Sequence, residues 1–259
     1  MIEAFLSAKV AIAAAWFAVL AAGERLAPAA PRPPGEARLF RNVGLWVANT
    51  LMSPLITVPI GVAAAAFQLW TRPDLGSASL ILDLIVLDLW TYAWHRANHE
   101  WPFLWRFHRV HHLDRFLDTT SAVRFHPGEV LISALARAPL IVLTDIPITS
   151  LLVFDTLVLL AALFHHSNVK LPASFEKVLR LFIATPSHHW VHHHTAREDT
   201  NSNYAVLLTI WDRVFGSWSR HPRTPAMPIG AGDAPDAPLL QLAAAPFRNT
   251  TAASAVDIV

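Results

Sequence analysis

Long apolar runs constrain the fold of this chain more than any other feature of its sequence. About 20 consecutive apolar residues are needed for a helix to cross a bilayer. Residues 4–22 form such a run, with Lys9 as their single charge. Four further runs cover residues 43–70, 78–94, 130–146 and 147–166. Because 54% of the residues are hydrophobic and only 15% are charged, we expect an all-α fold, namely an integral membrane helical bundle.

The individual runs differ in how well they fit a single membrane-spanning helix. A cleaved signal peptide is an alternative for the first run, but Glu3 stands where a basic segment is expected and the run is long. Pro54 and Pro59 are expected to kink the second run. The last three runs are short or interrupted, so tilted or partly crossing helices are compatible with them. Charges inside the runs need partners, and Arg137 is expected to pair with one of two acids, Asp83 or Asp155.

Basic residues alternate between successive connections. Residues 23–42 and 96–128 are rich in arginine, 71–79 hold only Arg72, and 145–149 hold no basic residue. The region after residue 166 is basic again. Cytoplasmic connections of membrane proteins carry the excess of Lys and Arg. We therefore expect a multi-pass membrane protein whose histidine clusters all lie on the cytoplasmic side.

The histidines are unusually concentrated. Of 14 in the chain, all but His126 and His221 lie in three places, and residues 188–194 read HHWVHHH. Three sets share a helical spacing of three or four residues: His95 and His99; His108, His111 and His112; His189, His192 and His193. On a helix each set projects from one face, so each can offer its imidazoles to a shared point.

This number of imidazoles points to metal. Imidazole nitrogen binds iron, zinc, copper and nickel, and eight or more exceed what one ion can take, so two ions are implied. The chain has no cysteine, which excludes thiolate ligands and iron–sulfur clusters. A surface histidine tract is the alternative, but such tracts are single, whereas these sets are separated by whole apolar segments.

The three sets also match a known family. HRANH at 95–99, HRVHH at 108–112 and HWVHH at 189–193 resemble the histidine boxes of the fatty acid hydroxylase/sterol desaturase superfamily of membrane di-iron enzymes. Supporting matches are DLWTYAWHR before the first box, RFHPGE at 124–129, LFHHSNV at 163–169 and NYAVLLTIWDRVFG at 203–216. The resemblance covers roughly residues 80–218. It implies a histidine-rich cytoplasmic helical cap over the membrane helices.

The resemblance also implies a ligand set and a reaction. The implied ligands of two iron ions are His95, His99, His108, His111, His112, His166, His189, His192 and His193. The implied activity is O₂-dependent hydroxylation of a lipid or sterol-like substrate, with desaturation as a second outcome of the same chemistry. Zinc in a purified sample is compatible with the same ligands. Two rival classes are a membrane metal-binding or transport protein and a zinc-dependent lipid hydrolase.

Other residues have more than one interpretation. Asp88 and Tyr92 precede His95 by two turns and one turn on the same helix face, so both are expected to support the ligands. Asp88 is expected to receive an imidazole N–H or, as the alternative, to pair with an arginine such as Arg96. His126 and His165 either ligate or serve the structure. His188 and His194 are expected to support the ligands, and His221 to lie on the surface.

The remaining features of the sequence limit the possible partners and indicate the domain boundaries. The net charge is +1, so nucleic acid is not an expected partner, and no HExxH, P-loop, GxSxG or dinucleotide motif is present. Oxygen chemistry consumes electrons, so a separate ferredoxin, cytochrome or reductase is expected. We predict N-terminal membrane helices with a proline-rich connector in residues 1–75 and a catalytic domain in 76–221. A loosely ordered tail is predicted for 222–259.

Overall fold

The computed structural model describes residues 2–67, 69–73, 75–232 and 236–248, and it is helical as predicted, with only isolated β-bridges in this part of the chain. The longer helices are α1 (Ile2–Leu26), α2 (Ala37–Met52), α3 (Thr57–Ala66), α4 (Ser77–Glu100), α5 (Pro102–His112), α6 (Pro127–Thr144) and α7 (Ile148–His166). The shorter elements are η1 (Thr119–Val123), α8 (Ala173–Leu179), α9 (Pro186–His192), α10 (Arg197–Thr200), α11 (Ile210–Val214), α12 (Leu239–Ala244) and η2 (Ala245–Phe247).

Each predicted apolar run contains a helix within the described residues. Within the described residues, four helices are long and apolar enough to cross a membrane: Ser7–Leu26 of α1, α4, α6 and α7. Helices α2 and α3 together form a fifth candidate span if the two helices, bent by 42° relative to each other, cross the membrane as one unit. The bend follows Met52, at the segment that contains Pro54, whereas Pro59 lies in the first turn of α3, where a missing N–H is tolerated. The predicted kink is therefore present, and Pro54 marks it.

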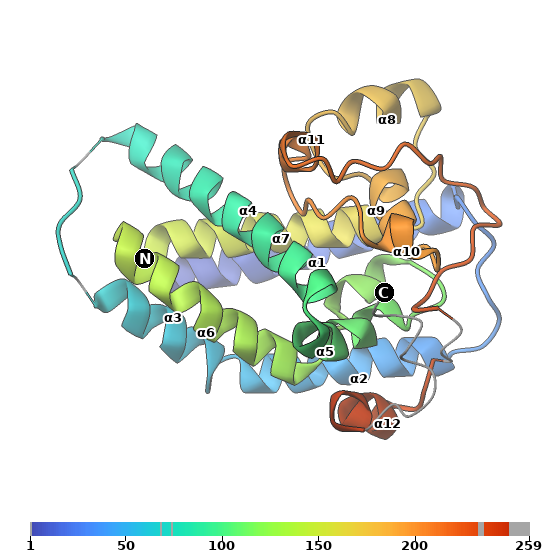
Figure 1. The fold of residues 1–259 in the computed structure, drawn as a ribbon, viewed down its shortest axis with the longest axis horizontal. Coiled ribbons are helices and arrows are strands. Elements are labelled where there is room, and N and C mark those ends of the chain that lie inside the picture. The colour runs from blue at the N-terminus through green and yellow to red at the C-terminus, as the bar shows by residue number, and fades with distance from the viewer. Residues whose placement is uncertain (1, 68, 74, 233–235, 249–259) are drawn as a thin grey trace.

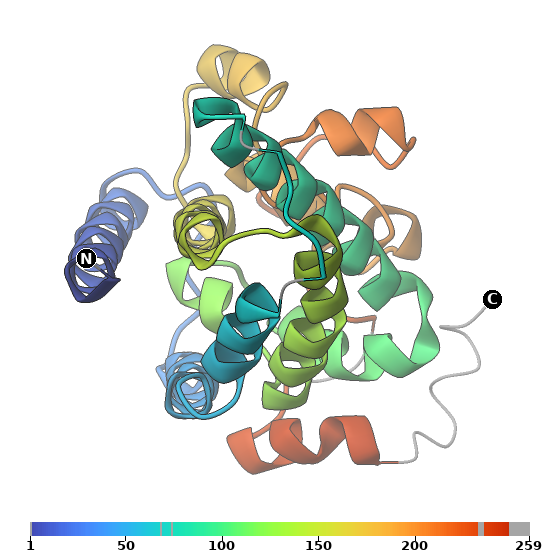
Figure 2. The same cartoon turned by 90° about the vertical axis from the view of Figure 1, so that its left-hand side faces the viewer.

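The connections lie at two opposite ends of the bundle. Figure 1 shows the α3–α4 connection and the α6–α7 turn at one end. The α1–α2 connector, α5 and α8 to α12 gather at the other end (Figures 1 and 2). The arginine-rich and arginine-poor connections predicted from the sequence are thus physically separated. We call the end that carries α5 and α9 the histidine end.

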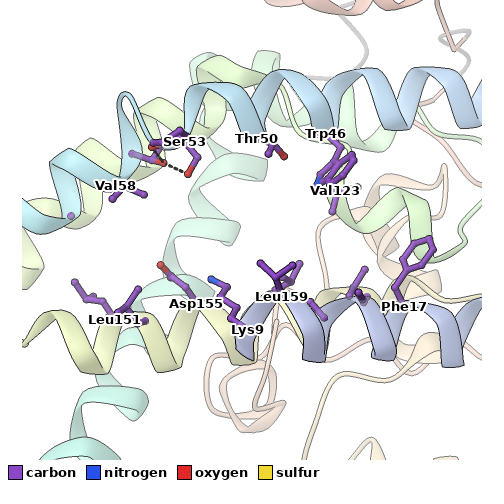
Figure 3. Close-up of a pocket in the computed structure, with 18 of the residues that line it drawn as sticks. Lys9, Phe17, Trp46, Thr50, Ser53, Val58, Val123, Leu151, Asp155 and Leu159 are labelled. Atoms are coloured by element: carbon purple, nitrogen blue, oxygen red, sulfur yellow. Dashed lines mark hydrogen bonds between the residues drawn. The ribbon is translucent and has the colours of Figure 1, made fainter. Parts of the chain in front are cut away.

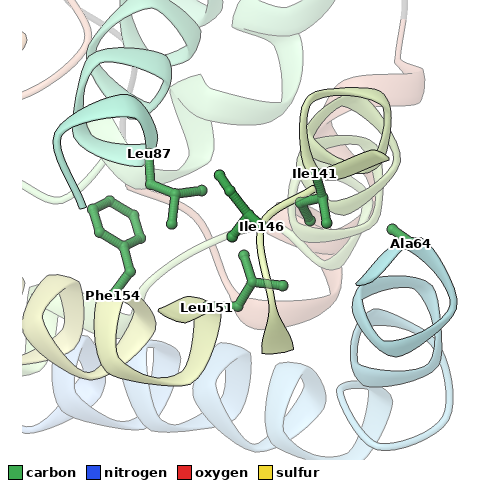
Figure 4. Packing of buried hydrophobic residues seen from close by; sticks show 6 residues of the cluster. All are labelled: Ala64, Leu87, Ile141, Ile146, Leu151 and Phe154. Atoms are coloured by element: carbon green, nitrogen blue, oxygen red, sulfur yellow. The ribbon is translucent and has the colours of Figure 1, made fainter. Parts of the chain in front are cut away.

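A compact apolar cluster joins the membrane helices near the opposite end. Leu87 of α4, Ile141 of α6, and Leu151 and Phe154 of α7 are buried together with Ala64 of α3 (Figure 4). Lipid tails are as apolar as these side chains, so close packing rather than removal from water stabilises such a cluster in a bilayer.

Three charged side chains in or beside the later spans, Arg137, Asp155 and Asp83, are paired. Arg137 Nη1 donates to Asp155 Oδ1 at 2.6 Å, which selects one of the two predicted acids. Asp83 is instead bound by Arg72 and by Ser150 Oγ at 2.6 Å. These pairs satisfy the rule that charges in an apolar segment need partners.

The described part of the tail is more ordered than predicted. Leu242 of α12 is fully buried with Leu45, Val110 and Leu113. Asp236 binds Arg124 through an ion pair whose closest N–O distance is 2.5 Å. The prediction of a loosely ordered tail is wrong for residues 236–248, because tertiary contacts stabilise a helix too short to show its own periodicity. Residues 233–235 and 249–259 of the predicted tail lie outside the described residues, and the predicted domain limits stay predictions.

Candidate metal centre

Two groups of histidines converge at the histidine end. The first group contains His95, His99, His108, His112 and His192, and the second contains His111, His166, His189 and His193. Within each group, the nitrogen atoms available for binding all lie within 4.8 Å of one another. All the histidines predicted as ligands belong to these two groups. The structure therefore brings together residues separated by almost 100 positions in the sequence.

Helices α5 and α9 each serve both groups. On α5, His108 and His112 point into the first group, whereas His111 points into the second. On α9 and its C-cap, His192 belongs to the first group, and His189 and His193 belong to the second. The expectation that each spaced set serves one shared point is therefore wrong for these two sets. A residue three positions along an α-helix is rotated by about 60°, which is enough to face a neighbouring point.

The two groups are adjacent. The rings of His112 and His193, which belong to different groups, stack with a centroid distance of 4.1 Å and an interplanar angle of 15°. His192 and His193 are consecutive residues, and their ring centroids are 5.4 Å apart. An ion held by one group would thus neighbour an ion held by the other.

Hydrogen bonds donated by Nδ1 orient three rings of the first group. The Nδ1 of His95 lies 2.7 Å from the Tyr204 carbonyl oxygen, and the Nδ1 of His192 lies 2.7 Å from the Ser202 carbonyl oxygen. The Nδ1 of His108 lies 2.7 Å from Glu129 Oε1. Since carbonyl and ionised carboxylate oxygens only accept, each Nδ1 carries the hydrogen, and each Nε2 presents a lone pair. The Nε2 atoms of His108 and His192 are buried and have no hydrogen-bond partner.

The second group shows the same arrangement. His111 Nδ1 donates to the Arg124 carbonyl at 3.2 Å, and His166 Nδ1 donates to the Ala162 carbonyl at 2.8 Å. Their Nε2 atoms therefore both present lone pairs, yet they lie only 3.0 Å apart. Two lone pairs cannot form a hydrogen bond with each other. A cation bound by both nitrogens removes this conflict.

Burial favours the neutral imidazole of His112, His189 and His193, which is the form that binds metal. Burial, followed by the charges of neighbouring imidazoles, holds the pKa of His112 well below its usual range, and the same causes lower the pKa of His189 and His193. Neither ring nitrogen of His112 has a hydrogen-bond partner. Buried polar atoms without partners are costly. The residues present thus fit a pair of metal ions bound through imidazole nitrogen.

Asp88 contacts neither of the groups predicted for it. Its Oδ2 accepts hydrogen bonds from Trp211 Nε1 at 2.8 Å and from the Leu208 N–H at 3.2 Å. Arg96 pairs with Glu100 instead. The prediction that Asp88 receives an imidazole N–H or pairs with Arg96 is therefore wrong, since the segment around α11 covers this face of α4. Asp88 attaches that segment to α4.

Tyr92 lies in the same region, away from the imidazole nitrogens. Its hydroxyl is 2.8 Å from Ser217 Oγ, and its ring stacks on Phe215 with centroids 5.3 Å apart. Ser217 in turn donates to Asp212. Tyr92 also makes an edge-on ring contact with Tyr204, whose carbonyl holds His95, with centroids 6.2 Å apart. Its predicted support of the ligands stays a prediction.

The remaining histidines lie outside both groups. His126 caps α6 by accepting from the Gly128 N–H, and its Nε2 donates to the Ala243 carbonyl at 3.0 Å. His165 is buried against the His189 ring, with centroids 4.1 Å apart. His188 contacts Asp212 at 3.0 Å. His194 and His221 both contact Asp199. These contacts favour the structural interpretation of His126, whereas both interpretations of His165 stay predictions, since its buried Nδ1 has no hydrogen-bond partner among the described residues.

Three supporting residues were not singled out from the sequence. Glu129 orients His108. The RFHPGE segment could have revealed it, because this segment places a carboxylate in the first turn of α6. Tyr204 holds His95 through its carbonyl, and its ring centroid lies 5.3 Å from that of His99. Asp212 accepts from the Tyr204 N–H at 2.8 Å. A backbone carbonyl leaves no residue-specific signal, so Tyr204 and Asp212 emerge only from the folded structure.

The fold and the site together define a class of protein: a multi-pass helical membrane protein with two adjacent histidine groups suited to metal at one end of its spans. The family model for fatty acid hydroxylase matches residues 80–217, which is more than half of the 259 residues. The chain belongs to the fatty acid hydroxylase family. This confirms the resemblance drawn from the histidine boxes.

Similar proteins include enzymes of lipid metabolism. The ornithine lipid hydroxylase OlsE of Rhizobium tropici is 31% identical over 180 residues, which cover 68% of this chain and 53% of that protein. The alkylglycerol monooxygenase of Danio rerio is 33% identical over 138 residues, covering 53% of this chain and 30% of that protein. The cholesterol 25-hydroxylase of Rattus norvegicus is 23% identical over 154 residues, covering 59% of this chain and 50% of that protein. The chain thus spans about half the length, or less, of these relatives. No solved structure matches it.

Proposed function

We propose that this protein is a membrane-bound, O₂-dependent oxidoreductase that hydroxylates a C–H bond of a lipid or sterol-like substrate. One observation carries the proposal: two adjacent groups of buried imidazoles converge, and several of their ring nitrogens, including the Nε2 atoms of His99, His112 and His192, have no hydrogen-bond partner among the described residues. The similarity to lipid hydroxylases and monooxygenases supports the choice of reaction.

The nine grouped histidines are proposed to hold two iron ions, one in each group. Imidazole suits zinc as well as iron, so the choice of iron relies on the family. A bound iron pair supplies the capacity to reduce O₂ and to oxidise an unactivated C–H bond. The chain's own residues fix the ligand rings through Glu129 and the carbonyls of Tyr204 and Ser202.

The position of the site suits a lipid substrate. His95 and His99 lie in the last turns of α4, and His166 is the last residue of α7. Both helices are candidate membrane spans, so a lipid can reach the histidine end without crossing water. The imidazoles are buried, and a site without bulk water protects a reactive oxidant from side reactions.

Hydroxylation is preferred over desaturation because it follows from a single hydrogen abstraction. Either reaction consumes two electrons, and the sequence contains no motif for a flavin or nicotinamide cofactor. We propose that a separate ferredoxin, cytochrome or reductase supplies them. By the positive-inside rule, the histidine end and this donor are proposed to lie on the cytoplasmic side.

Metal analysis of the purified protein, together with oxygen uptake, tests this function. We expect two irons per chain and O₂ consumption that depends on an added reductant. One zinc ion with no oxygen uptake would contradict the proposal and favour a hydrolase. Lipid profiling of cells with and without the protein then identifies substrate and product, since hydroxylation adds one oxygen atom and desaturation removes two hydrogens.

A further inference from the structure

A cavity of about 970 Å³ lies among the membrane helices, and no histidine lines it. Its walls come from α1, α2, α3 and α7 (Figure 3). Helix α1 packs against α7 on one side of the cavity. On the other side, α2 packs against η1 and α6. The lining is mostly apolar, and Val10, Trp46 and Val58 are among its exposed side chains. The volume is that of a ligand pocket rather than a packing defect.

The cavity leads toward the histidine end. Its inner residues include Val123 of η1 and Leu163 of α7. Leu163 precedes His166 by three residues, which is about one helical turn. Val123 precedes Phe125 by two residues, and the Phe125 ring stacks on His111 with centroids 4.5 Å apart. The cavity lining is therefore linked to two members of the second histidine group, to His166 along α7 and to His111 through the Phe125 ring.

Charged groups occur in the cavity wall at the depth of a membrane span. The Arg137–Asp155 ion pair lines the cavity, and Lys9 lines it from α1. Figure 3 shows Lys9 and Asp155 directed into the same space. Lys9 forms no ion pair with any residue whose side chain the structure describes. The three groups leave one excess positive charge in an otherwise apolar wall.

Hydroxyl groups lie across the cavity from these charges. Thr50 and Ser53 line it from α2 and the bend that follows, and Ser53 Oγ is 2.8 Å from Thr57 Oγ1. Ionisable residues inside a membrane are expensive, and they mark substrate or ion pathways. Thr57 Oγ1 donates to the Ser53 carbonyl, so Ser53 Oγ donates to Thr57 Oγ1, and the Thr50 hydroxyl is the one left to face a ligand. An ammonium with no ion-pair partner among the described side chains suits an anionic group.

We propose that this cavity binds a single-chain lipid whose anionic head group lies at Lys9 and Arg137 and whose alkyl chain extends toward the histidine end. The proposal rests on the proposed function, because it makes this lipid the substrate. His166 follows Asp155 by eleven residues on α7. At 1.5 Å per residue this separation is about 16 Å, so carbons far from the head group, not those beside it, reach the histidine end.

Gly61 of α3 allows the cavity to be filled without disturbing the fold. It lines the cavity, and a Cβ atom added there meets no atom within 4 Å. Its neighbour Val62 is 47% exposed and does not line the cavity, so Val62→Phe is a matched control. We would crosslink a photoreactive palmitate to each variant in phosphatidylcholine nanodiscs and map the labelled peptides.

Wild type and Val62→Phe are expected to be labelled on α1, α3 and α7, and Gly61→Phe to lose labelling by roughly tenfold or more, with unchanged iron content. Equal labelling of Gly61→Phe and wild type would overturn the cavity as the binding site. A failure of wild type to oxidise any lipid would overturn the proposed function and the role of the bound lipid as substrate, but not the cavity as its binding site, since the labelling needs no turnover.

The head group is tested by competition in the same nanodiscs. Palmitate and lysophosphatidate carry different anions, and whichever displaces the label more strongly identifies a carboxylate or a phosphate as the preferred group. Hexadecanol has no charge and is expected to compete roughly tenfold less well. Lys9→Met should remove the preference for the anionic lipids over hexadecanol, and Lys9→Arg should keep it. Equal competition by hexadecanol would overturn the anionic head group.

Discussion

At the scale of single residues, hydrogen bonds donated by Nδ1 decide what several of the grouped histidines can do. His95, His192 and His111 donate from Nδ1 to backbone carbonyls, so their Nε2 atoms are free to bind metal. The carbonyl partners belong to segments after α9 and to the η1–α6 connection. Ligand orientation is thus imposed by segments distant from the helices that carry the histidines.

Removing one ligand from each group tests this arrangement. His111→Ala and His192→Ala are each expected to abolish turnover, because each removes a nitrogen from a different group. Membrane insertion should persist in both, which fractionation of membranes checks. His221→Ala is the control, since its side chain is 53% exposed and contacts only the Asp199 region. Full activity in either ligand variant would contradict the assignment.

Glu129 offers a test of ligand support. Glu129→Ala removes the acceptor of His108 Nδ1–H and is expected to weaken iron binding by about 10-fold to 100-fold. Glu129→Gln retains an oxygen that can accept this hydrogen and should bind iron more tightly than the alanine variant. The rate of iron loss to a chelator measures the difference. Identical rates in the two variants would show that the hydrogen bond is unimportant.

At the scale of elements, short segments hold the metal-binding helices in place. Arg124 connects α2, α5 and the tail, because it binds Asn42 Oδ1 at 2.9 Å, the Val110 carbonyl at 3.0 Å and Asp236. Its own carbonyl accepts from His111 Nδ1. The tail therefore contributes to the position of a ligand although it contains none of the grouped histidines.

Two leucines of α12, one buried and one exposed, test whether this helix packs against the rest of the protein. Leu242 is fully buried, and Leu242→Ala is expected to destabilise the protein by about 2–5 kcal/mol. Leu240 is 84% exposed, so Leu240→Ala should change stability by less than about 0.5 kcal/mol. Unfolding in detergent, followed by tryptophan fluorescence, compares the two. Equal losses would mean that α12 does not pack as the structure has it.

At the scale of the whole molecule, the two ends of the bundle differ in charge and in chemistry. The arginine-rich connector and the histidine groups share one end, and the α6–α7 turn lies at the other (Figure 1). The positive-inside rule predicts that the histidine end faces the cytoplasm. Because the chain lacks cysteine, single introduced cysteines give an unambiguous test of this orientation.

We expect a membrane-impermeant maleimide to label Leu75→Cys in intact cells and to label Arg220→Cys only after the membrane is opened. Leu75 is 54% exposed in the α3–α4 connection, and Arg220 is exposed at the histidine end. The cysteine-free parent protein is the control for background labelling. The reverse pattern would place the histidine end outside the cytoplasm.

Acid should destabilise the metal-free protein. Burial holds the pKa of His111, His112 and His193 below the ordinary value of 6.5, so below that pH the unfolded chain takes up protons that the folded chain does not. Stability is therefore lost as pH falls through this range. We expect the unfolding temperature of the metal-free protein to drop between about pH 7.5 and about pH 5.5. An unchanged value would contradict the burial of neutral imidazoles.

The sequence by itself determined the helical membrane fold and the set of grouped histidines. Apolar runs and spacings of three or four residues are local, and each reports the length or the face of one helix. Only the tertiary structure decided that α5 and α9 divide their histidines between two groups and that Asp88 binds Trp211 rather than an imidazole. Relative rotation of helices and contacts from distant loops set these features, and no local pattern encodes either. The ordered α12 likewise depends on packing against residues far away in the chain.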